Sequence, residues 1–535
     1  MKKGRSLVEA GKLSPQREYW RQGGFLLLAQ VNAAALHGLQ GIPIVVEVDV
    51  GSGLPQFAIV GLPDAALREA RERVRSAIKN AGFAFPDGRI TVNLAPADLP
   101  KEGPAFDLAL AVGLLAAAGT VSLGEWAGAV FLGELSLDGS LRPIDGILPL
   151  LSSLKEEGFQ RFLIPRANAA EAAWVAGTEA YPLDSLGQVV ELLRGDREGV
   201  PAPPARFNPA AAAAGADFAE VRGQEHAKRA LEVAAAGGHN VYLVGPPGSG
   251  KTMLARRLPG ILPSLTFEEA LELSQIYSVA GLLSDTNSLI TQRPFRSPHH
   301  TISTAGLVGG GHLPRPGEIT LAHLGVLFLD EFPEFSRSIL EALRQPLEDG
   351  VVTISRAQAS YTYPARPLLV AASNPCPCGY YGDVTRACTC TPYAIQRYRA
   401  RVSGPILDRL DLHVEVPRVP YADLAEPKAR AEPSAAVRER VEAARQVQRE
   451  RFHGTPTRTN AEMTPAQLAR FCRLDKGGQD LLRNAYAALG LSARAHSRIL
   501  KVARTIADLA GSERIAVEHV AEALQYRALD RAIEA

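Results

Sequence analysis

Residues 245–252 read Gly-Pro-Pro-Gly-Ser-Gly-Lys-Thr, and this stretch decides the class of fold. The apolar run Val241–Val244 precedes it and predicts a buried parallel strand. Residues 253–258 have the spacing of a helix, which Pro259 should end. A glycine-rich turn between strand and helix directs backbone N–H groups inward and adds the partial positive charge of a helix N-terminus. The sequence therefore predicts a phosphate-binding loop.

The residue types in this loop assign particular contacts to a nucleotide. Lys251 would reach the β- and γ-phosphates of ATP, and the Thr252 hydroxyl would be a ligand of Mg²⁺. The residues expected to hold the nucleotide are Gly245, Pro246, Pro247, Gly248, Ser249, Gly250, Lys251 and Thr252. The alternative is a chance glycine-rich turn. The strand before the loop, the helix after it and the filled motif positions all argue against that alternative.

A second apolar run, Val326–Leu329, ends in the acidic pair Asp330-Glu331. Carboxyl ends of parallel strands face one crevice, so this pair should face the phosphate-binding loop. Asp330 is expected to hold Mg²⁺ through water, and Glu331 to polarise the attacking water. The plainer interpretation is two exposed carboxylates on a turn that follows a strand.

The composition is that of a globular protein, with 46% hydrophobic and 21% charged residues. A length of 535 residues predicts two to four domains. The formal net charge of +1 gives no overall field that attracts nucleic acid, so such binding would need local patches. No window is long and apolar enough to span a membrane. The polar first 22 residues and the short apolar run after them resemble a signal peptide only superficially, and we interpret the chain as cytoplasmic.

The pattern along the chain predicts six segments. They are an extension (1–25), a mixed α/β domain (26–198), a Pro/Ala-rich linker (199–217), an α/β core with the phosphate-binding loop (218–418), a helical connector (419–463) and a C-terminal helical lid (464–535). In the first domain we expect strands at 42–50, 88–94 and 130–137 and helices at 64–81 and 106–118. Further helices are expected at 435–452, whose many Arg and Glu residues predict a solvated face, and at 492–509 and 515–529.

Four of the five cysteines lie in one segment, as Cys376-x-Cys378 and Cys388-x-Cys390. Disulfides are unusual in a cytoplasmic chain. Four thiolates around a tight loop suffice for a tetrahedral Zn²⁺ site, although a spacing of one residue is less usual than two to four. The alternative is four reduced, partly buried cysteines. Cys472 stands alone and is expected in the core.

Several longer motifs together resemble an AAA+ ATPase of the magnesium-chelatase-like branch. They are Val221–Gln224, the phosphate-binding loop, Phe295–His300, Arg315–His323, Asp330-Glu331, Asn374–Gly379 and Ser403–Arg409. Their order, with the preceding domain, is similar to the ComM/YifB family of competence-associated proteins. The resemblance covers nearly everything from residue 28 onward.

The resemblance implies roles for three further residues. Asn374 would be the first sensor, which orients the attacking water; alone it would be interpreted as a strand-end asparagine that caps a turn. Arg409 would be an arginine finger on the ATP of a neighbouring subunit, and otherwise a surface arginine paired with Asp408 or Asp411. Arg494 would be the second sensor on the lid, and otherwise an ordinary helix-surface arginine. A finger that acts in trans implies a closed ring, and the family suggests a homo-hexamer.

The resemblance also places an insert at residues 296–312 and a hairpin at residues 351–363, with Arg356 near the hairpin tip. In related ring motors such hairpins line the pore and contact nucleic-acid backbone, so Arg356 is a candidate DNA contact. A plain structural hairpin is an equal alternative.

The first domain resembles the Lon-type protease domain, with a ribosomal S5 domain 2-like α/β fold. Residues 100–105, 133–139 and 141–146 carry this likeness. A Ser–Lys dyad would require serine at Ala105 and lysine near Leu148, and neither hydrocarbon side chain can do that chemistry. Lys155 lies about two helical turns beyond and does not replace the lysine. We therefore expect a binding or assembly domain without proteolysis.

These features together predict an ATP-hydrolysing ring motor with Mg²⁺ and a structural Zn²⁺. By resemblance it would act on single-stranded or branched DNA, as a helicase that promotes branch migration in recombination and natural transformation. Alternatives are the motor subunit of a magnesium–porphyrin chelatase, a protein-remodelling ATPase, an ATP-dependent protease, which Ala105 argues against, and a non-catalytic scaffold, which the complete ATPase motif set contradicts.

Overall fold

The computed structural model describes residues 28–62, 65–99, 101, 103–208, 216–284, 286–311, 315–355, 360–383, 385–419 and 432–527. The chain forms two compact units, one from Met1–Arg206 with Gly281–Ser288 and one from Phe207–Ala280 with Leu289–Ala535. The boundary at residue 206 falls among the residues expected to form the linker. The expected N-terminal extension and the candidate DNA contact Arg356 lie outside the described residues.

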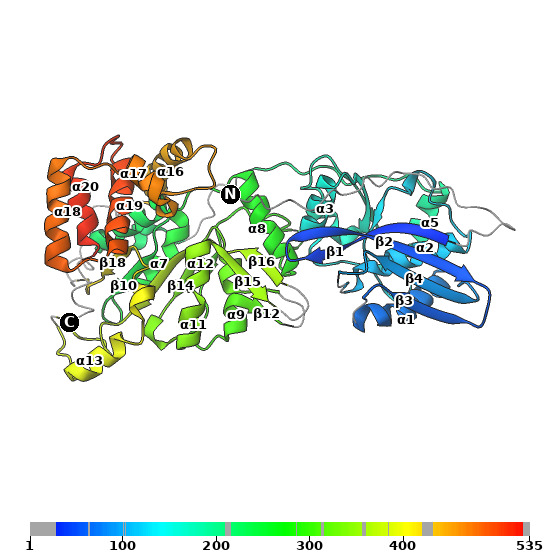
Figure 1. Cartoon of the computed structure of the whole chain (residues 1–535), viewed down its shortest axis with the longest axis horizontal. Coiled ribbons are helices and arrows are strands. Elements are labelled where there is room, and N and C mark those ends of the chain that lie inside the picture. The colour runs from blue at the N-terminus through cyan, green and yellow to red at the C-terminus, as the bar shows by residue number, and fades with distance from the viewer. Residues whose placement is uncertain are drawn as a thin grey trace, which may run out of the picture. The chain divides into compact units, whose positions relative to one another are not determined.

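The first unit is built on a mixed sheet of seven strands in the order β3-β4-β2-β1-β5-β8-β9. Strands β1, β2, β3 and β4 of this sheet are labelled in Figure 1. Its strands are β1 (Leu28–His37), β2 (Gln40–Gly51), β3 (Gln56–Val60), β4 (Arg89–Ala95), β5 (Val130–Phe131), β8 (Arg161–Pro165) and β9 (Glu179–Leu183). Strand β2 runs antiparallel to β1 and β4, whereas β1, β5, β8 and β9 run parallel. The sequence predicted β2 and β4 because their apolar residues alternate.

Helices cover this sheet and complete its core. They are α1 (Ala65–Asn80), α2 (Asp107–Ala117), α3 (Ile147–Glu156), α4 (Ala169–Ala172) and α5 (Leu186–Arg194). All residues of α2 are buried, and the helix packs on β1, β2 and α1. This explains why its sequence is apolar all round rather than amphipathic.

The single strand expected at residues 130–137 is wrong, because the chain leaves the sheet after β5. The Gly133 N–H donates to the Ala105 carbonyl, and its carbonyl accepts from the Leu108 N–H. The next strand, β6 (Glu134–Leu135), pairs instead with β7 (Leu141–Arg142) in a small antiparallel ribbon. The prediction failed because Gly133 and β6 pair with residues 105, 108 and 141–142, which the pattern within residues 130–137 does not contain.

The second unit contains a five-stranded parallel sheet in the order β11-β14-β17-β10-β18. The strands are β10 (Val241–Val244), β11 (Phe295–Arg296), β14 (Val326–Leu329), β17 (Leu368–Ser373) and β18 (Leu412–Glu415). Strands β10 and β14 have the predicted bounds. Because all five strands are parallel, the residues that follow β10, β14 and β17 meet at one edge.

Nine helices of the described residues surround this sheet, and of these the sequence analysis gave bounds only for the helix after the phosphate-binding loop. They are α6 (Glu225–Gly237), α7 (Lys251–Arg257), α8 (Phe267–Val279), α9 (Thr304–Val308), α10 (Glu318–Leu321), α11 (Arg337–Ala342), α12 (Arg344–Asp349), α13 (Pro392–Arg399) and α14 (Gly404–Leu407). Helix α7 begins two residues earlier than predicted and continues into a 3₁₀ helix at Leu258–Ile261, so Pro259 tightens the helix rather than ending it.

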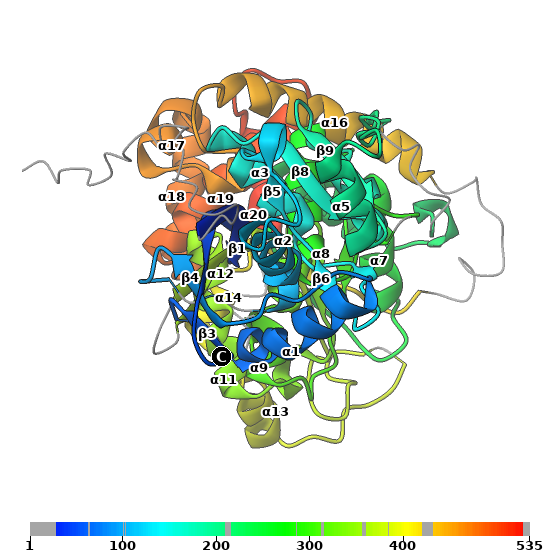
Figure 2. The same cartoon turned by 90° about the vertical axis from the view of Figure 1, so that its right-hand side faces the viewer.

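The C-terminal helices, coloured orange to red, form a helical region beside the core (Figure 1, Figure 2). They are α16 (Ser434–Arg451), α17 (Pro465–Phe471), α18 (Lys476–Leu489), α19 (Ala493–Leu509) and α20 (Val517–Gln525). Both α16 and α19 pack on α6 of the core. Helix α16 is therefore not only a solvated helix, because Val437, Val441, Ala444 and Gln448 form a buried stripe.

Two antiparallel hairpins stand outside the parallel sheet. Strands β15 (Val351–Ser355) and β16 (Ser360–Pro364) form the predicted hairpin, and β12 (Gly309–Gly310) pairs with β13 (Arg315–Pro316). Within the described part of the chain, the structure contains no helix with both the length and the apolar character needed to cross a membrane.

Candidate nucleotide-binding site

The phosphate-binding loop joins β10 to α7 at the carboxyl edge of the parallel sheet. Gly250 precedes α7 with a φ of 94°, a backbone conformation that residues with a side chain rarely adopt. Because of this turn, α7 begins with Lys251 and Thr252. Strands β17 and β18 flank β10, so the loop lies beside the residues that follow both neighbours.

Lys251 is a buried cation whose hydrogen-bond acceptors among the described residues are all uncharged. Its Nζ donates to the carbonyl oxygens of Gly245 at 2.6 Å and Pro246 at 3.0 Å and to Asn374 Oδ1 at 3.3 Å. Burial lowers the pKa of Lys251 to about 8, and attraction to the Asp330 carboxylate only partly offsets this. A polyphosphate would supply the missing negative charge. The donor set therefore fits a nucleotide.

Thr252 and the acidic pair come together as the sequence predicted. The Thr252 hydroxyl donates to Asp330 Oδ2 at 2.8 Å, and the Glu331 N–H donates to Asp330 Oδ1 at 2.9 Å. A hydroxyl and a carboxylate at this distance are hard oxygen ligands of the kind Mg²⁺ takes. These residues could hold Mg²⁺ beside the phosphates.

Glu331 has a neighbour that the sequence reasoning missed. His300 Nδ1 lies 3.0 Å from Glu331 Oε2, and the His300 ring lies 4.1 Å from the His299 ring, between centroids. His300 follows β11, which runs parallel to β14, so both side chains reach the same edge. The contact could have been predicted only from the parallel pairing of β11 with β14, because no local sequence pattern indicates it. His300 is thus placed to position the Glu331 carboxylate.

Asn374 follows β17 and contacts Lys251, which places it between the two strands that carry the loop and the acidic pair. The residue before it, Ser373, is fixed by a hydrogen bond of 2.7 Å between its hydroxyl and that of Tyr242. An amide held here can face a terminal phosphate and a water.

Gln224 is the last residue of the motif Val221–Gln224, and its side chain links two edges of the site. Its Nε2 donates to the Ser249 carbonyl at 3.3 Å and to the Pro417 carbonyl. Gln224 has a φ of 60° at the start of α6. The motif therefore braces the phosphate-binding loop against the segment that follows β18.

The two arginines assigned by resemblance do not reach the loop in the single chain. Arg409 is buried, and its guanidinium contacts the Glu348 carboxylate and the Pro405 carbonyl, not Asp408 or Asp411. Arg494 is exposed near the start of α19. Among the described hydrogen bonds, none joins either arginine to residues 245–252.

Helix α19, which carries Arg494, is tied to the core through buried polar groups. Arg498 Nη1 lies 3.4 Å from Asp411 Oδ1, and His239 lies between Asp411 and the Thr505 hydroxyl, with its Nε2 2.8 Å from the latter. Burial raises the pKa of Asp411, but Arg498 and His239 outweigh this and lower it to about 2. The lid is thus held to the core next to the start of β18.

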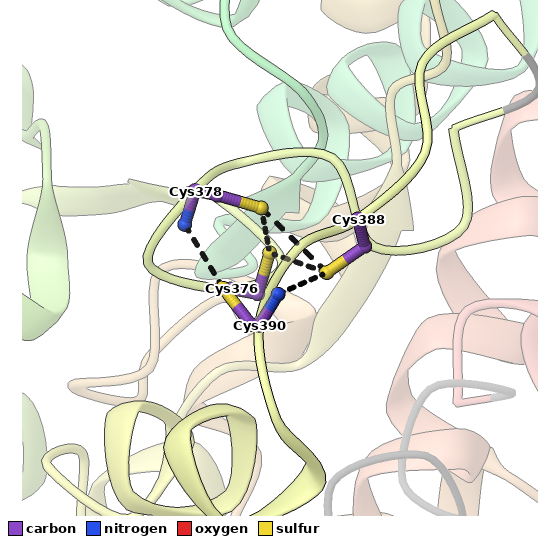
Figure 3. Close-up of side chains that lie close together, drawn as sticks. All are labelled: Cys376, Cys378, Cys388 and Cys390. Atoms are coloured by element: carbon purple, nitrogen blue, oxygen red, sulfur yellow. Dashed lines mark hydrogen bonds between the residues drawn. The ribbon is translucent and has the colours of Figure 1, made fainter.

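The four clustered cysteines converge on one point (Figure 3). The Sγ atom of Cys376 lies 3.4 Å from that of Cys378 and 3.7 Å from that of Cys388, and the sulfurs of Cys378 and Cys388 are 3.6 Å apart. All four ligand atoms lie within 4.8 Å of one another. This set fits a thiolate-liganded metal. Cys472 is buried, as expected.

Ala105 and Leu148, where the Lon-type resemblance would require a Ser–Lys dyad, carry hydrocarbon side chains. Ala105 lies in the 3₁₀ helix Pro104–Phe106, and Leu148 is buried in α3. Lys101 is fully buried and donates to the Pro96 carbonyl, and burial lowers its pKa. Pro100 and Glu102 of the same motif lie outside the described residues.

The parallel sheet, its phosphate-binding loop and the acidic pair define a P-loop ATPase of the AAA+ class. Three family models agree: "Magnesium chelatase, subunit ChlI" matches residues 217–424, "Subunit ChlI of Mg-chelatase" matches 46–168, and "Magnesium chelatase, subunit ChlI C-terminal" matches 431–527. The chain is also 46% identical to competence protein ComM of Haemophilus influenzae over 511 residues, which are 95% of the chain and 99% of that protein.

Other relatives support the same assignment. The uncharacterized protein YifB of Escherichia coli is 45% identical over 505 residues, 94% of the chain and 98% of that protein. The chain also has a weaker likeness to Lon protease 2 of Bacillus subtilis, which is 25% identical over 203 residues, 35% of the chain and 36% of that protein. The chain belongs to the ComM/YifB family of magnesium-chelatase-like AAA+ ATPases.

Proposed function

We propose that the protein is an ATP-driven ring motor that acts on single-stranded or branched DNA and promotes branch migration during recombination. The observation that carries this proposal is the assembled site: Lys251, Thr252, Asp330 and Asn374 meet at one edge of the sheet. The name competence protein, borne by a relative that matches 95% of the chain, supports DNA as the substrate.

Each residue of the site has a defined task in hydrolysis. Lys251 exchanges its backbone acceptors for phosphate oxygens and offsets their charge. Glu331, positioned by His300, polarises the attacking water and takes its proton at the carboxylate. Asn374 orients that water against the terminal phosphate. When bound with ATP through Thr252 and Asp330, Mg²⁺ supplies charge neutralisation at the phosphates.

Arg409 and Arg494 complete the site from the subunit interface and the lid. In a ring, Arg409 would exchange Glu348 for the phosphate of a neighbouring subunit and stabilise the transferring group. An interface in which one subunit supplies the loop and the next the arginine is heterologous, and closed rings repeat such an interface. We propose a homo-hexamer that works in the cytoplasm, with the Lon-like unit as a binding or assembly domain without protease activity.

The first test is ATP hydrolysis by the purified full chain, with and without single-stranded and forked DNA. Lys251→Ala is the control for contaminating activity. We expect hydrolysis that DNA stimulates and that the variant lacks. A four-stranded junction with one labelled arm then tests migration, which should require ATP and fail in Lys251→Ala.

A second candidate is a chelatase-like motor subunit, favoured by the descriptions of the three matching family models. It would hydrolyse ATP at a rate that no DNA structure changes. That result would overturn the DNA proposal and leave a chelatase-like or protein-remodelling ATPase.

A further inference from the structure

The four cysteines have the spacing of a tetrahedral zinc site. A Zn–S distance of about 2.3 Å places neighbouring sulfurs of a tetrahedron about 3.8 Å apart. In the structure, the sulfurs of Cys376, Cys378 and Cys388 are 3.4 to 3.7 Å apart. The N–H of Cys378 donates to the Cys390 sulfur and the N–H of Cys390 to the Cys388 sulfur, each at 3.4 Å. Such N–H donors stabilise thiolates, as the outer shell of a metal site does.

The segment that carries these cysteines has too little core to keep its shape alone. Of the described residues from 376 to 390, only Cys376 and Gly379 are buried. Asp383 accepts from the N–H groups of Thr385 and Arg386 and lies 3.0 Å from Arg418. The Asp383 side chain is almost fully buried, but Thr385 and Arg386 belong to the same segment and the Arg418 side chain is 41% exposed, so these contacts hold the segment only weakly against the rest of the fold. In a segment of this kind, metal binding supplies the folding free energy.

The same segment packs directly on the nucleotide-binding site. Cys376 follows Asn374 by two residues. A Cβ atom added to Gly379 would lie 2.6 Å from Pro247 Cδ in the phosphate-binding loop and 3.8 Å from Asn374 Cγ. The backbone of the cysteine segment therefore supports both the loop that holds phosphate and the amide that faces it.

We propose that Cys376, Cys378, Cys388 and Cys390 bind one Zn²⁺ and that this zinc loop holds Pro247 and Asn374 in their working positions. Loss of the metal releases Gly379 from Pro247 and lowers the rate of ATP hydrolysis, although no cysteine contacts the nucleotide. The effect on hydrolysis rests on the proposed ATPase function, whereas zinc binding does not.

The first arm of the test measures zinc in the full chain, purified without chelator, by elemental analysis and by release with a thiol-specific mercurial. We expect about one Zn²⁺ per chain from the four ligands. Cys378→Ser and Cys388→Ser should each lose the metal, and Cys472→Ala should keep it. A wild-type chain that holds no zinc, and takes up none when reduced and given Zn²⁺ alone, would overturn the proposal.

The second arm tests whether the contact of Gly379 with Pro247 affects ATP hydrolysis while the zinc stays bound. It changes no cysteine. Gly379 and Gly382 have φ values of 86° and 80°, so alanine strains the backbone similarly at each, but Gly382 has no neighbour within 4 Å of an added Cβ. Gly379→Ala should keep zinc and lower kcat by about tenfold or more, because misplacement by about 1 Å costs up to about 100-fold. Gly382→Ala should remain within about twofold.

Binding of a fluorescent ATP analogue is measured for the same pair of variants, so that the coupling is tested even if the wild-type chain hydrolyses no ATP. That outcome would reject the proposed ATPase function, not the zinc site. Equal behaviour of Gly379→Ala and Gly382→Ala in both binding and hydrolysis would reject the coupling.

Discussion

At the scale of single residues, the surroundings of Lys251 set the pKa of its amine. It is buried among backbone carbonyls and an amide, and its pKa is lowered to about 8. A bound polyphosphate favours the charged form and raises this pKa. Nucleotide binding and protonation of Lys251 are therefore linked, and the sign of the linkage follows from the two states.

We expect nucleotide affinity to fall as the pH rises above about 8. Below this pH Lys251 is charged in both the free and the nucleotide-bound protein, so the affinity does not change with pH. Above it the free protein must take up a proton when the nucleotide binds. The apparent Kd therefore rises by up to about tenfold per pH unit. Titration of a fluorescent Mg–ATP analogue from pH 7 to pH 9.5 measures this. Lys251→Ala should bind weakly without the slope, and a flat wild-type profile would contradict the prediction.

Glu331→Gln should separate binding from hydrolysis. The amide keeps the size of the side chain and can still contact His300, but it cannot take a proton from water. We expect the hydrolysis rate to fall by about 10²- to 10⁴-fold. Nucleotide affinity should change little. Single-turnover hydrolysis and nucleotide titration check the two halves, and a comparable loss in both would argue against Glu331 as the general base.

At the scale of secondary-structure elements, a buried polar cluster joins helices α16 and α19. The Asp508 carboxylate is fully buried and accepts from Arg451 at 2.6 Å, Arg504 at 3.0 Å and Asn460 at 2.8 Å. The sequence predicted a helix at residues 492–509, but not that charged residues such as Arg504 and Asp508 are buried in it. Only the tertiary structure brings Arg451 of α16 to this carboxylate.

Removal of the Asp508 carboxylate should destabilise the second unit strongly. Asp508→Ala leaves two guanidinium groups buried without their partner, which costs about 3 to 5 kcal/mol. Asp480→Ala is the matched control, because its pair with Arg483 is exposed and contributes less than about 1 kcal/mol. Thermal unfolding followed by fluorescence should show a clearly lower transition only for Asp508→Ala. Equal shifts in the two variants would contradict the expected role.

Elements could be predicted where short-range pattern decides them. Strands β10 and β14 are apolar runs bounded by turn or acidic residues, and both were predicted with the bounds that the structure has. The strand expected at residues 130–137 failed, because Gly133 pairs with Ala105 and residue 108 across the sequence. In the site, the position of Asp330 after a buried strand predicted that it would face the phosphate-binding loop, and the structure places it in contact with Thr252. The contact of His300 with Glu331 depends on strand order, which the local pattern does not contain.

At the scale of the whole molecule, the proposed ring rests on Arg409. In one chain its guanidinium is buried against Glu348 and the Pro405 carbonyl, away from the phosphate-binding loop of the same chain. A buried arginine with one side-chain partner can change that partner when a neighbouring subunit brings a polyphosphate. Arg409 would then serve the next subunit and not its own.

Mixing two inactive variants tests this arrangement. Lys251→Ala lacks the loop lysine but keeps Arg409, and Arg409→Ala has the opposite defect, so each should hydrolyse little ATP alone. In a mixed head-to-tail ring, about one quarter of the interfaces join an intact loop to an intact finger, which sets the restored rate at up to about one quarter of wild type. Steady-state hydrolysis of the equimolar mixture, after subunit exchange, measures this. Exchange is confirmed by energy transfer between labelled subunits. If exchange occurs and activity stays at the sum of the two variants, Arg409 acts within its own chain or only supports the fold through Glu348, and the finger in trans is wrong.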